Sequence, residues 1–396
     1  MQAASNLRFE WVTDAARFAQ LRAGWNALGV SAIHTVFLTY DWLSIWLEEL
    51  APHVELHVLT AWEGDRLVAT LPLCADPTQD RGRRWAIMGV GTLPPNHLDI
   101  IAEPDILDAV RAQFAAKLLE ERANWDVLEL DKIPADSDTV EALTSAFGRA
   151  GLSTACSVSA VCPYADLPST AEEYAAGRKK SIRKQIRGAV RWLEEKPGTR
   201  ELTLADSVDA ALGAQANLVR FHQARWKGKG YPGAFADPRV VGFHERMIAA
   251  AQEAGYLRMY SLVDENDVIA VSYNYRVGPT VQGYLSSFDE RWSEASPGLT
   301  IRIGVINESI HDGAAQFDFL EGTESYKASW CTGQRENLRL TVFNRTFAGK
   351  AAQVRLAASE ATVHVARAVL PEGVRERVVK AIARQHAEGQ TDSTDS

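Results

Sequence analysis

The sequence has few of the features that mark an exported, membrane-spanning or metal-binding chain. No apolar run approaches the roughly 20 residues that cross a bilayer, and residues 1–10 lack the cationic and apolar regions of a secretory signal. There is no HExxH motif and no histidine–cysteine cluster, so no metal site is predicted. The chain has only 4 cysteines, none in CxxC spacing: Cys74, Cys156, Cys162 and Cys331. We therefore expect a cytoplasmic protein with buried, reduced thiols and no transmembrane segment.

An excess of positive charge is also lacking. The 42 Lys and Arg residues are outnumbered by 51 Asp and Glu residues, which gives a net charge of −9. This balance argues against a general nucleic-acid-binding protein. A hydrophobic content of 46% is typical of a folded chain, and 396 residues are too many for one ordinary core. We expect two domains of comparable size.

In the second half, short turns separate alternating apolar runs, a pattern that predicts an antiparallel meander. The expected strands are Leu257–Val263, Val268–Val277 and Val281–Phe288. A helix is predicted over Leu299–His311 because apolar residues recur there at helical spacing on more than one face. Gly313 would end this helix, and residues 316–320 return to extended structure.

The first half repeats this order. Strands are expected at Glu55–Trp62, Arg66–Leu73 and Arg84–Met88, followed by a helix near Asp105–Arg122 and a strand at Trp125–Leu130. The repeat predicts a mixed α/β (α+β) fold of two tandem domains, each with a mostly antiparallel sheet flanked by helices. The predicted divisions are an N-terminal domain at 1–165, a C-terminal domain at 166–348, and a helical extension with a disordered tail at 349–396.

Two motifs in the second half carry a family resemblance. Ser296-Pro297-Gly298 precedes the apolar helix, and Phe317-Asp318-Phe319-Leu320 leads into Gly322-Thr323-Glu324-Ser325-Tyr326-Lys327. With the strand order, these resemble the GCN5-related N-acetyltransferase (GNAT) fold, and within it the BioF2-like, or cellulose-biosynthesis-type, acetyltransferases related to the FemAB aminoacyltransferases. Residues 37–42 and 67–73 are similar to the opening of that family. Many members carry an acidic residue where Thr323 stands, which weakens the case for paired carboxylates here.

The resemblance implies an acyl-CoA donor, with acetyl the expected acyl group, and an amine or hydroxyl acceptor such as a glycan or its precursor. Ser296, Pro297, Gly298 and Leu299 would bind the donor pyrophosphate, because the first turn of a helix presents free N–H groups and partial positive charge. The alternative is that Ser296 caps a structural helix with Pro297 in its first turn.

Acyl transfer needs a base, a proton donor and stabilisation of negative charge. The candidate catalytic residues are Asp318, Glu324, Tyr326 and Lys327. Asp289 is a weaker candidate base, and Tyr284 a second candidate proton donor. Each has a structural alternative: a carboxylate paired with a cation, a solvated turn residue or a core tyrosine. His222 and His244 are interpreted as structural. No cysteine or serine lies in an activated set, so direct attack without a covalent intermediate is expected.

A cationic helix face is the remaining feature, formed by Lys180, Arg183, Lys184, Arg187 and Arg191. It suits a coenzyme A phosphate, a tRNA acceptor stem, or an anionic glycan or lipid, or else it is a solvated face. The alternative function is therefore a FemAB-like transferase that uses aminoacyl-tRNA. Apart from this alternative, the negative net charge argues against a nucleic-acid partner. A degenerate, non-catalytic binding protein, with residues 354–365 as a docking helix, is the third hypothesis.

Overall fold

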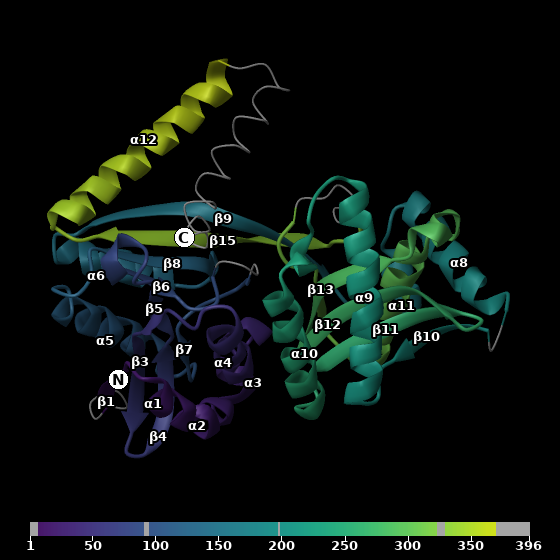
Figure 1. The fold of residues 1–396 in the computed structure, drawn as a ribbon, viewed down its shortest axis with the longest axis horizontal. Helices are drawn as coiled ribbons and strands as arrows, with labels where there is room; N and C mark the ends of the chain where they lie inside the picture. Colours follow the sequence, from purple (N-terminus) through teal and green to yellow (C-terminus); the bar gives the residue numbers. More distant parts are fainter. Residues whose placement is uncertain (1–6, 91–94, 197–198, 323–328, 370–396) are drawn as a thin grey trace.

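The computed structural model describes residues 7–90, 95–196, 199–322 and 329–369. In Figure 1 the first half of the chain (purple and blue) lies beside the second half (teal and green), and two long strands run between them. Most neighbouring strands are antiparallel, so the predicted mixed α/β class is confirmed.

The first half builds a small sheet and one end of a large one. Its helical segments are α1 (Ala15–Gln20), α2 (Arg22–Ala27), α3 (Gly29–Ala32), η1 (Val36–Leu38), α4 (Tyr40–Glu49), η2 (Asp80–Gly82), α5 (Leu107–Glu120) and α6 (Thr139–Arg149). The small sheet has the order β1 (Arg8–Val12), β3 (Val58–Glu63), β4 (Arg66–Leu71) and β7 (Ile101–Ala102). The large sheet takes β2 (Glu55–Leu56), β5 (Leu73–Ala75), β6 (Arg84–Ile87) and β8 (Val127–Pro134).

The predicted hairpin over residues 55–73 is divided between these two sheets, which corrects the expectation of two continuous strands. The break lies at His57 on one arm and at Pro72 on the other. Proline has no backbone N–H to donate to a neighbouring strand, while its carbonyl accepts a hydrogen bond from the N–H of Met88 (2.9 Å). The hairpin therefore bends at Pro72 and supplies strands to both sheets.

The second half continues the large sheet and covers it with helices. Its helical segments are α7 (Ala171–Ala176), α8 (Lys180–Glu194), α9 (Val208–Gly228), η3 (Ala234–Ala236), α10 (Pro238–Glu253), η4 (Glu290–Ala295), α11 (Pro297–His311) and α12 (Phe347–Val369). Its strands are β10 (Arg200–Leu204), β11 (Leu257–Asp264), β12 (Asp267–Val277), β13 (Thr280–Phe288), β14 (Gln316–Asp318) and β15 (Gly333–Phe343), joined by β9 (Ser153–Asp166). The predicted meander, apolar helix and returning strand are thus confirmed.

Strands β9 and β15 tie the halves into one large sheet. The order is β10-β11-β12-β13-β14-β9-β15-β8-β6-β5-β2, so β15, the last strand among the described residues, lies between β9 and β8. Each half contains an antiparallel pair followed by a parallel pair across a helix: β6 pairs with β8 and β13 with β14. The repeated element order is confirmed, and the division into domains at residues 165 and 348 stays a prediction.

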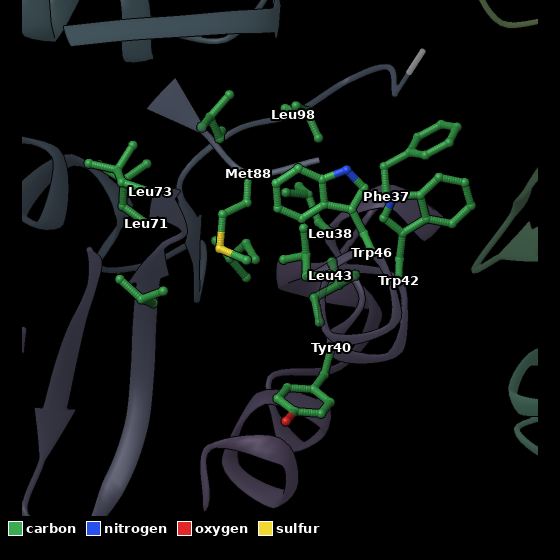
Figure 2. Close-up of a cluster of buried hydrophobic side chains, with 14 of the residues drawn as sticks. Phe37, Leu38, Tyr40, Trp42, Leu43, Trp46, Leu71, Leu73, Met88 and Leu98 are labelled. Atoms are coloured by element: carbon green, nitrogen blue, oxygen red, sulfur yellow. The ribbon is translucent and has the colours of Figure 1, made fainter. Parts of the chain in front are cut away.

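Helices cover both faces of the second-half sheet. Apolar residues of α9 and α10 pack with one side of β12, and those of α11 and α8 pack with the other. The α9–α10 layer continues into the first half through an aromatic cluster around Phe37 and Trp42, which lie next to each other in Figure 2. The ring of Trp42 is 4.9 Å from that of Phe243 and 5.7 Å from that of Tyr284. Aromatic pairs at these distances are stabilising, so this core holds the halves together.

Two cysteines and the start of α12 are more exposed than the rest of the core. Cys74 and Cys162 are buried, but Cys156 is exposed and Cys331 is half-buried, so the expectation of four buried thiols is wrong for those two. In Figure 1, α12 rises away from the sheet instead of lying along it. Phe347, at the start of α12, is 90% exposed.

Candidate active site

Strands β13 and β14 run side by side for only three residues before they separate. The parallel register joins Thr280 to Gln316 and ends at Gln282 and Asp318. The chain then turns through Leu320, whose φ is 52°, and the N–H of Phe319 donates to the carbonyl of Pro163 (2.9 Å) on β9. On the edge of β13 that faces β14, residues 283–288 have no strand partner among the residues that the structure describes.

A cavity of about 480 Å³ opens where the two strands separate. Its walls come from β13, from the turn after β14, and from helices on both faces of the sheet. They include Asn96, His222, Arg225, Trp226, Lys229, Ala234, Phe235, His244, Ser272, Asn274, Gly283, Tyr284, Leu285, Ser286, Ser287, Ile301, Arg302, Val305, Phe317, Phe319, Leu320 and Glu321. A cavity of this size suits part of an organic ligand. Side chains of α9 and α11, which lie on opposite faces of the sheet, both contribute to its walls.

Tyr284 occupies a β-bulge in the cavity wall. The register pairs Asn274 with Gly283 and Tyr273 with Leu285, so Tyr284 is the extra residue. Its ring lies 5.4 Å from those of both His244 and Tyr273. Burial raises the pKa of Tyr284 well above its ordinary value, so the phenol keeps its proton at neutral pH. The second candidate proton donor thus lies in the cavity wall, and its catalytic role stays a prediction.

Two histidines that were interpreted as structural also line the cavity. Burial lowers the pKa of His244 to about 3, and burial likewise lowers the pKa of His222. Both imidazoles are therefore neutral at pH 7. His222 packs against Phe235 (5.1 Å between ring centroids) and Trp226 (5.9 Å). No spacing in the sequence pointed to this pair, because α9 and α10 bring the two residues to one cavity only in the fold.

Asp318 ends β14 and is fully buried beneath this region. Its Oδ1 accepts a hydrogen bond from the N–H of Leu320 (2.7 Å). Its Oδ2 lies 3.0 Å from Nε2 of His97 and 3.5 Å from Nη1 of Arg335. Burial alone would raise the pKa of Asp318, but His97 and Arg335 outweigh it and hold this pKa below its ordinary value. Asp318 is not among the residues that line the cavity, and its predicted role as base stays untested.

A buried polar network continues from His97 to the cavity floor. Nδ1 of His97 lies 3.0 Å from Oδ1 of Asn337, whose Nδ2 donates to Oδ1 of Asn96 (3.3 Å). The Cys162 thiol also donates to Oδ1 of Asn96 (3.3 Å), and burial raises the pKa of this thiol to about 12. Sequence reasoning missed this network. The signal that could have found it is the polar pair Asn96-His97 directly before an apolar run.

The structure places the predicted donor-binding residues at the start of α11. Pro297 takes the first helical position, and Ser296 adopts a left-handed conformation (φ 53°) without a side-chain cap to the helix. A Cβ on Gly298 would lie 3.0 Å from the ring of Phe288, so glycine permits close packing there. The residues of α11 that line the cavity come from its next turns and are Ile301, Arg302 and Val305. A donor role for Ser296–Leu299 stays a prediction.

The other predicted catalytic residues divide into two groups. Glu324, Tyr326 and Lys327 lie outside the residues that the structure describes. Asp289, the weaker candidate base, caps η4 and holds Arg291 in a two-pronged ion pair (2.6 Å), which is a structural arrangement. One carboxylate that was not predicted, Glu321, lines the cavity and pairs with Lys132 at 2.6 Å.

Within the described parts of the chain, no group of three or more His, Cys, Asp or Glu side chains is arranged to hold a metal ion. Likewise, no helix there has the length and apolar character that crossing a membrane requires.

Comparisons with known proteins agree with this geometry. Residues 180–328, which are less than half of the chain, match the model of the Acetyltransferase (GNAT) domain family, so this segment is similar to a GNAT domain. No curated protein matches the chain in sequence.

Solved structures show the fold over nearly the whole chain. FemX superposes with a TM-score of 0.57 at 9% identity, covering 83% of this chain and 96% of its own. L-PGS from Bacillus licheniformis gives 0.51 at 13% identity, covering 87% and 95%. The C-terminal domain of a putative lysylphosphatidylglycerol synthetase from Agrobacterium fabrum gives 0.51 at 12% identity, covering 87% and 96%. At these identities the likeness concerns the fold alone.

Proposed function

We propose that this protein is an acyltransferase that moves an acyl group, with acetyl the first to test, from acyl-CoA to an amine or hydroxyl acceptor. The observation that carries the proposal is the separation of β13 and β14 after Gln282 and Asp318, with the cavity opening in the gap. An extended thioester arm can lie along the unpaired edge of β13, where backbone groups are free to bind it. The match of residues 180–328 to the GNAT domain family supports this proposal.

The reaction is a single displacement at the thioester carbonyl. The acceptor nitrogen or oxygen forms a bond to the carbonyl carbon, and the carbon–sulfur bond breaks to release the coenzyme A thiolate. A base takes the acceptor's proton, and an acid protonates the thiolate. An oxyanion forms when the acceptor attacks the carbonyl carbon and disappears when the carbon–sulfur bond breaks. Backbone N–H groups of the β13 edge stabilise this oxyanion.

His222 and Tyr284 are the residues that we assign to proton transfer. His222 lines the cavity and is neutral at pH 7 because burial lowers its pKa. Tyr284 lies in the β13 wall and keeps its proton because burial raises its pKa. A proton passing from His222 back to Tyr284 through solvent restores both groups. Asp318 would act behind the cavity by fixing the Leu320 turn, and Lys327 and Glu324 remain further candidates.

Direct attack is favoured over a covalent acyl-enzyme. The thiol of Cys162 contacts the cavity residue Asn96. Since burial raises the pKa of this thiol to about 12, it is protonated at neutral pH and is a poor nucleophile.

A FemAB-like aminoacyl-tRNA-dependent transferase is the second candidate function. The observation that favours it is the cationic face of α8. Its exposed residues Lys180, Lys184, Arg187 and Arg191 make no ion pair with any residue described in the structure. Uncompensated cations on a helix surface suit a nucleic-acid backbone. A glycan acceptor, by contrast, rests on the family resemblance alone.

Thermal-shift measurements with acetyl-CoA, desulfo-CoA and an aminoacyl-tRNA separate these functions. Saturable stabilisation by acetyl-CoA and by desulfo-CoA is the result that we expect. Stabilisation by tRNA alone, with a steep dependence on salt, would support the second candidate instead. No response to any of the three would contradict both transferase functions.

A further inference from the structure

The mouth of the cavity carries a cluster of cations and an aromatic side chain that the proposed donor site does not use. Arg225, Trp226 and Lys229 come from the end of α9 and line the cavity. The donor is expected along β13 and α11, which form other walls. The α9 wall is therefore left for the acceptor.

The charge of this mouth is positive. Arg225, Lys229 and Arg302 line the cavity, and Glu321 is the only carboxylate among its described lining residues. Glu321 is itself paired with Lys132 at 2.6 Å. Arg225 and Lys229 are exposed and form no ion pair with the described residues around them. An anion entering here would meet two cations, Arg225 and Lys229, that no carboxylate of the described residues pairs with.

An aromatic surface stands beside these cations. Trp226 is 37% exposed and its ring packs edge-on against Tyr231 (6.0 Å), which is 49% exposed. Nζ of Lys229 lies 5.4 Å from the centre of the Trp226 ring. Exposed aromatic side chains with a polar rim are typical of binding surfaces. They offer a flat apolar face next to the positive charge.

The loop that holds this cluster has a fixed shape. The N–H groups of Lys229 and Tyr231 both donate to the carbonyl of Trp226 (3.0 Å each). The Gln223 side chain donates to the carbonyl of Pro232 (3.0 Å). Gly233 has a φ of 77°, and a Cβ there would lie 2.3 Å from Oε1 of Gln223, so only glycine fits. The cations and the aromatic ring are thus presented together on a closed turn.

We propose that Arg225, Lys229 and Trp226 form the acceptor subsite, and that the acceptor is a ring-bearing molecule with a phosphate or carboxylate group. The acceptor's anion lies between the two cations, its ring packs on Trp226, and its amine or hydroxyl points toward His222. This inference rests on the proposed function, since it names the second substrate of the same cavity.

The test uses matched sugars with the full-length protein. Glucosamine 6-phosphate and muramic acid carry an amine and an anion, whereas glucosamine carries the amine alone. Calorimetry in the presence of saturating CoA should show at least one anionic sugar binding about tenfold or more tightly than glucosamine. The double variant Arg225→Gln/Lys229→Gln should lose this preference. Lys227→Gln is the matched control, because Lys227 is exposed on the same helix end but does not line the cavity.

Several results would overturn the inference. The inference is wrong if neither anionic sugar binds, or if glucosamine binds as tightly as the anionic sugars. It is also wrong if the double variant keeps the preference for anionic sugars, or if Lys227→Gln loses that preference to the same extent. A separate titration with desulfo-CoA alone tests the proposed function without an acceptor. If the double variant weakens desulfo-CoA instead of the sugars, the cations hold the donor's phosphates and only this inference fails. If Arg225 and Lys229 only stabilise the end of α9, the double variant will have a lower melting temperature and an unchanged preference for anionic sugars. That result also contradicts the inference.

Discussion

Nε2 of His97 lies 3.0 Å from Oδ2 of Asp318, and both side chains are almost completely buried. His97 belongs to the loop before β7 of the first half, and Asp318 ends β14 of the second. Among the described residues neither atom has a hydrogen bond of good geometry, so the contact is a close electrostatic approach rather than an aligned hydrogen bond. It joins the two halves behind the cavity.

Replacing Asp318 should destabilise the fold. Asp318→Asn removes the charge that His97 and Arg335 face, and breaking a buried pair on one side costs roughly 3 kcal/mol of unfolding free energy. Urea unfolding measures this loss. Asp166→Asn is the matched control, because Asp166 is an exposed residue of β9, and we expect it to change the unfolding free energy by less than about 1 kcal/mol. Equal effects of the two variants would contradict the role given to Asp318.

The contribution of Asp318 should also depend on pH. Its pKa in the folded protein is below the ordinary value of 3.8, so folding favours the charged form. The stabilisation is then fully present above the unfolded pKa and disappears as pH falls through the lower, folded pKa. Compared with Asp318→Asn, the wild type should keep a constant advantage above about pH 5 and lose it progressively below about pH 4. An advantage that grows on acidification would contradict this assignment.

Tyr273 and Tyr275 form a second buried pair, and we expect their mutations to have non-additive effects on the free energy of unfolding. Their hydroxyl groups are hydrogen-bonded to each other, and both side chains are fully buried. Removing one hydroxyl leaves the other without this partner, at a cost of about 1–3 kcal/mol. The double Phe variant removes both and should cost less than the sum of the single variants. A double-mutant cycle from urea unfolding measures the difference, and strict additivity would show that the hydroxyl pair does not interact.

The element order was predictable because it is local. The runs over residues 257–288 and the apolar helix at 299–311 follow from side-chain spacing, and the structure has strands and a helix there. The divided hairpin at Pro72 was not predicted, because the choice between two sheets depends on distant partners. The cavity could not be predicted from the sequence either. His222, Tyr284 and Asn96 lie in three separate segments that meet only in the fold.

The cysteines should differ in reactivity. Cys156 is exposed, whereas Cys74 and Cys162 are buried and burial raises the pKa of each thiol to about 12. Alkylation of the native protein at pH 8, followed by peptide mass spectrometry, should modify Cys156 first and leave Cys74 and Cys162 protected. In denaturant all four should react. Early modification of Cys162 in the native state would contradict the closed floor of the cavity.

His222 should set the acid limb of the pH–rate profile. Since its pKa is lowered by burial from the ordinary value of 6.5, the base is protonated and lost only as pH falls below that value. Release of the coenzyme A thiol, measured with a chromogenic disulfide and the best acceptor found, gives the profile. His222→Gln should lower kcat by about 10²–10⁴-fold and remove this limb. His53→Gln changes a half-exposed residue outside the cavity and should alter neither. A retained limb in His222→Gln would assign the base elsewhere.

The central claim is that acyl-CoA binds in the gap between β13 and β14, and calorimetric titration with acetyl-CoA tests it most directly. Ser286 is exposed and lines the cavity, so Ser286→Trp would fill the gap with little disturbance of the core, and Ser157→Trp places the same side chain on an exposed site of β9. We predict a dissociation constant on the order of micromolar for the wild type and for Ser157→Trp, and binding at least about tenfold weaker for Ser286→Trp. No binding by the wild type, or equal binding by all three proteins, would contradict the account.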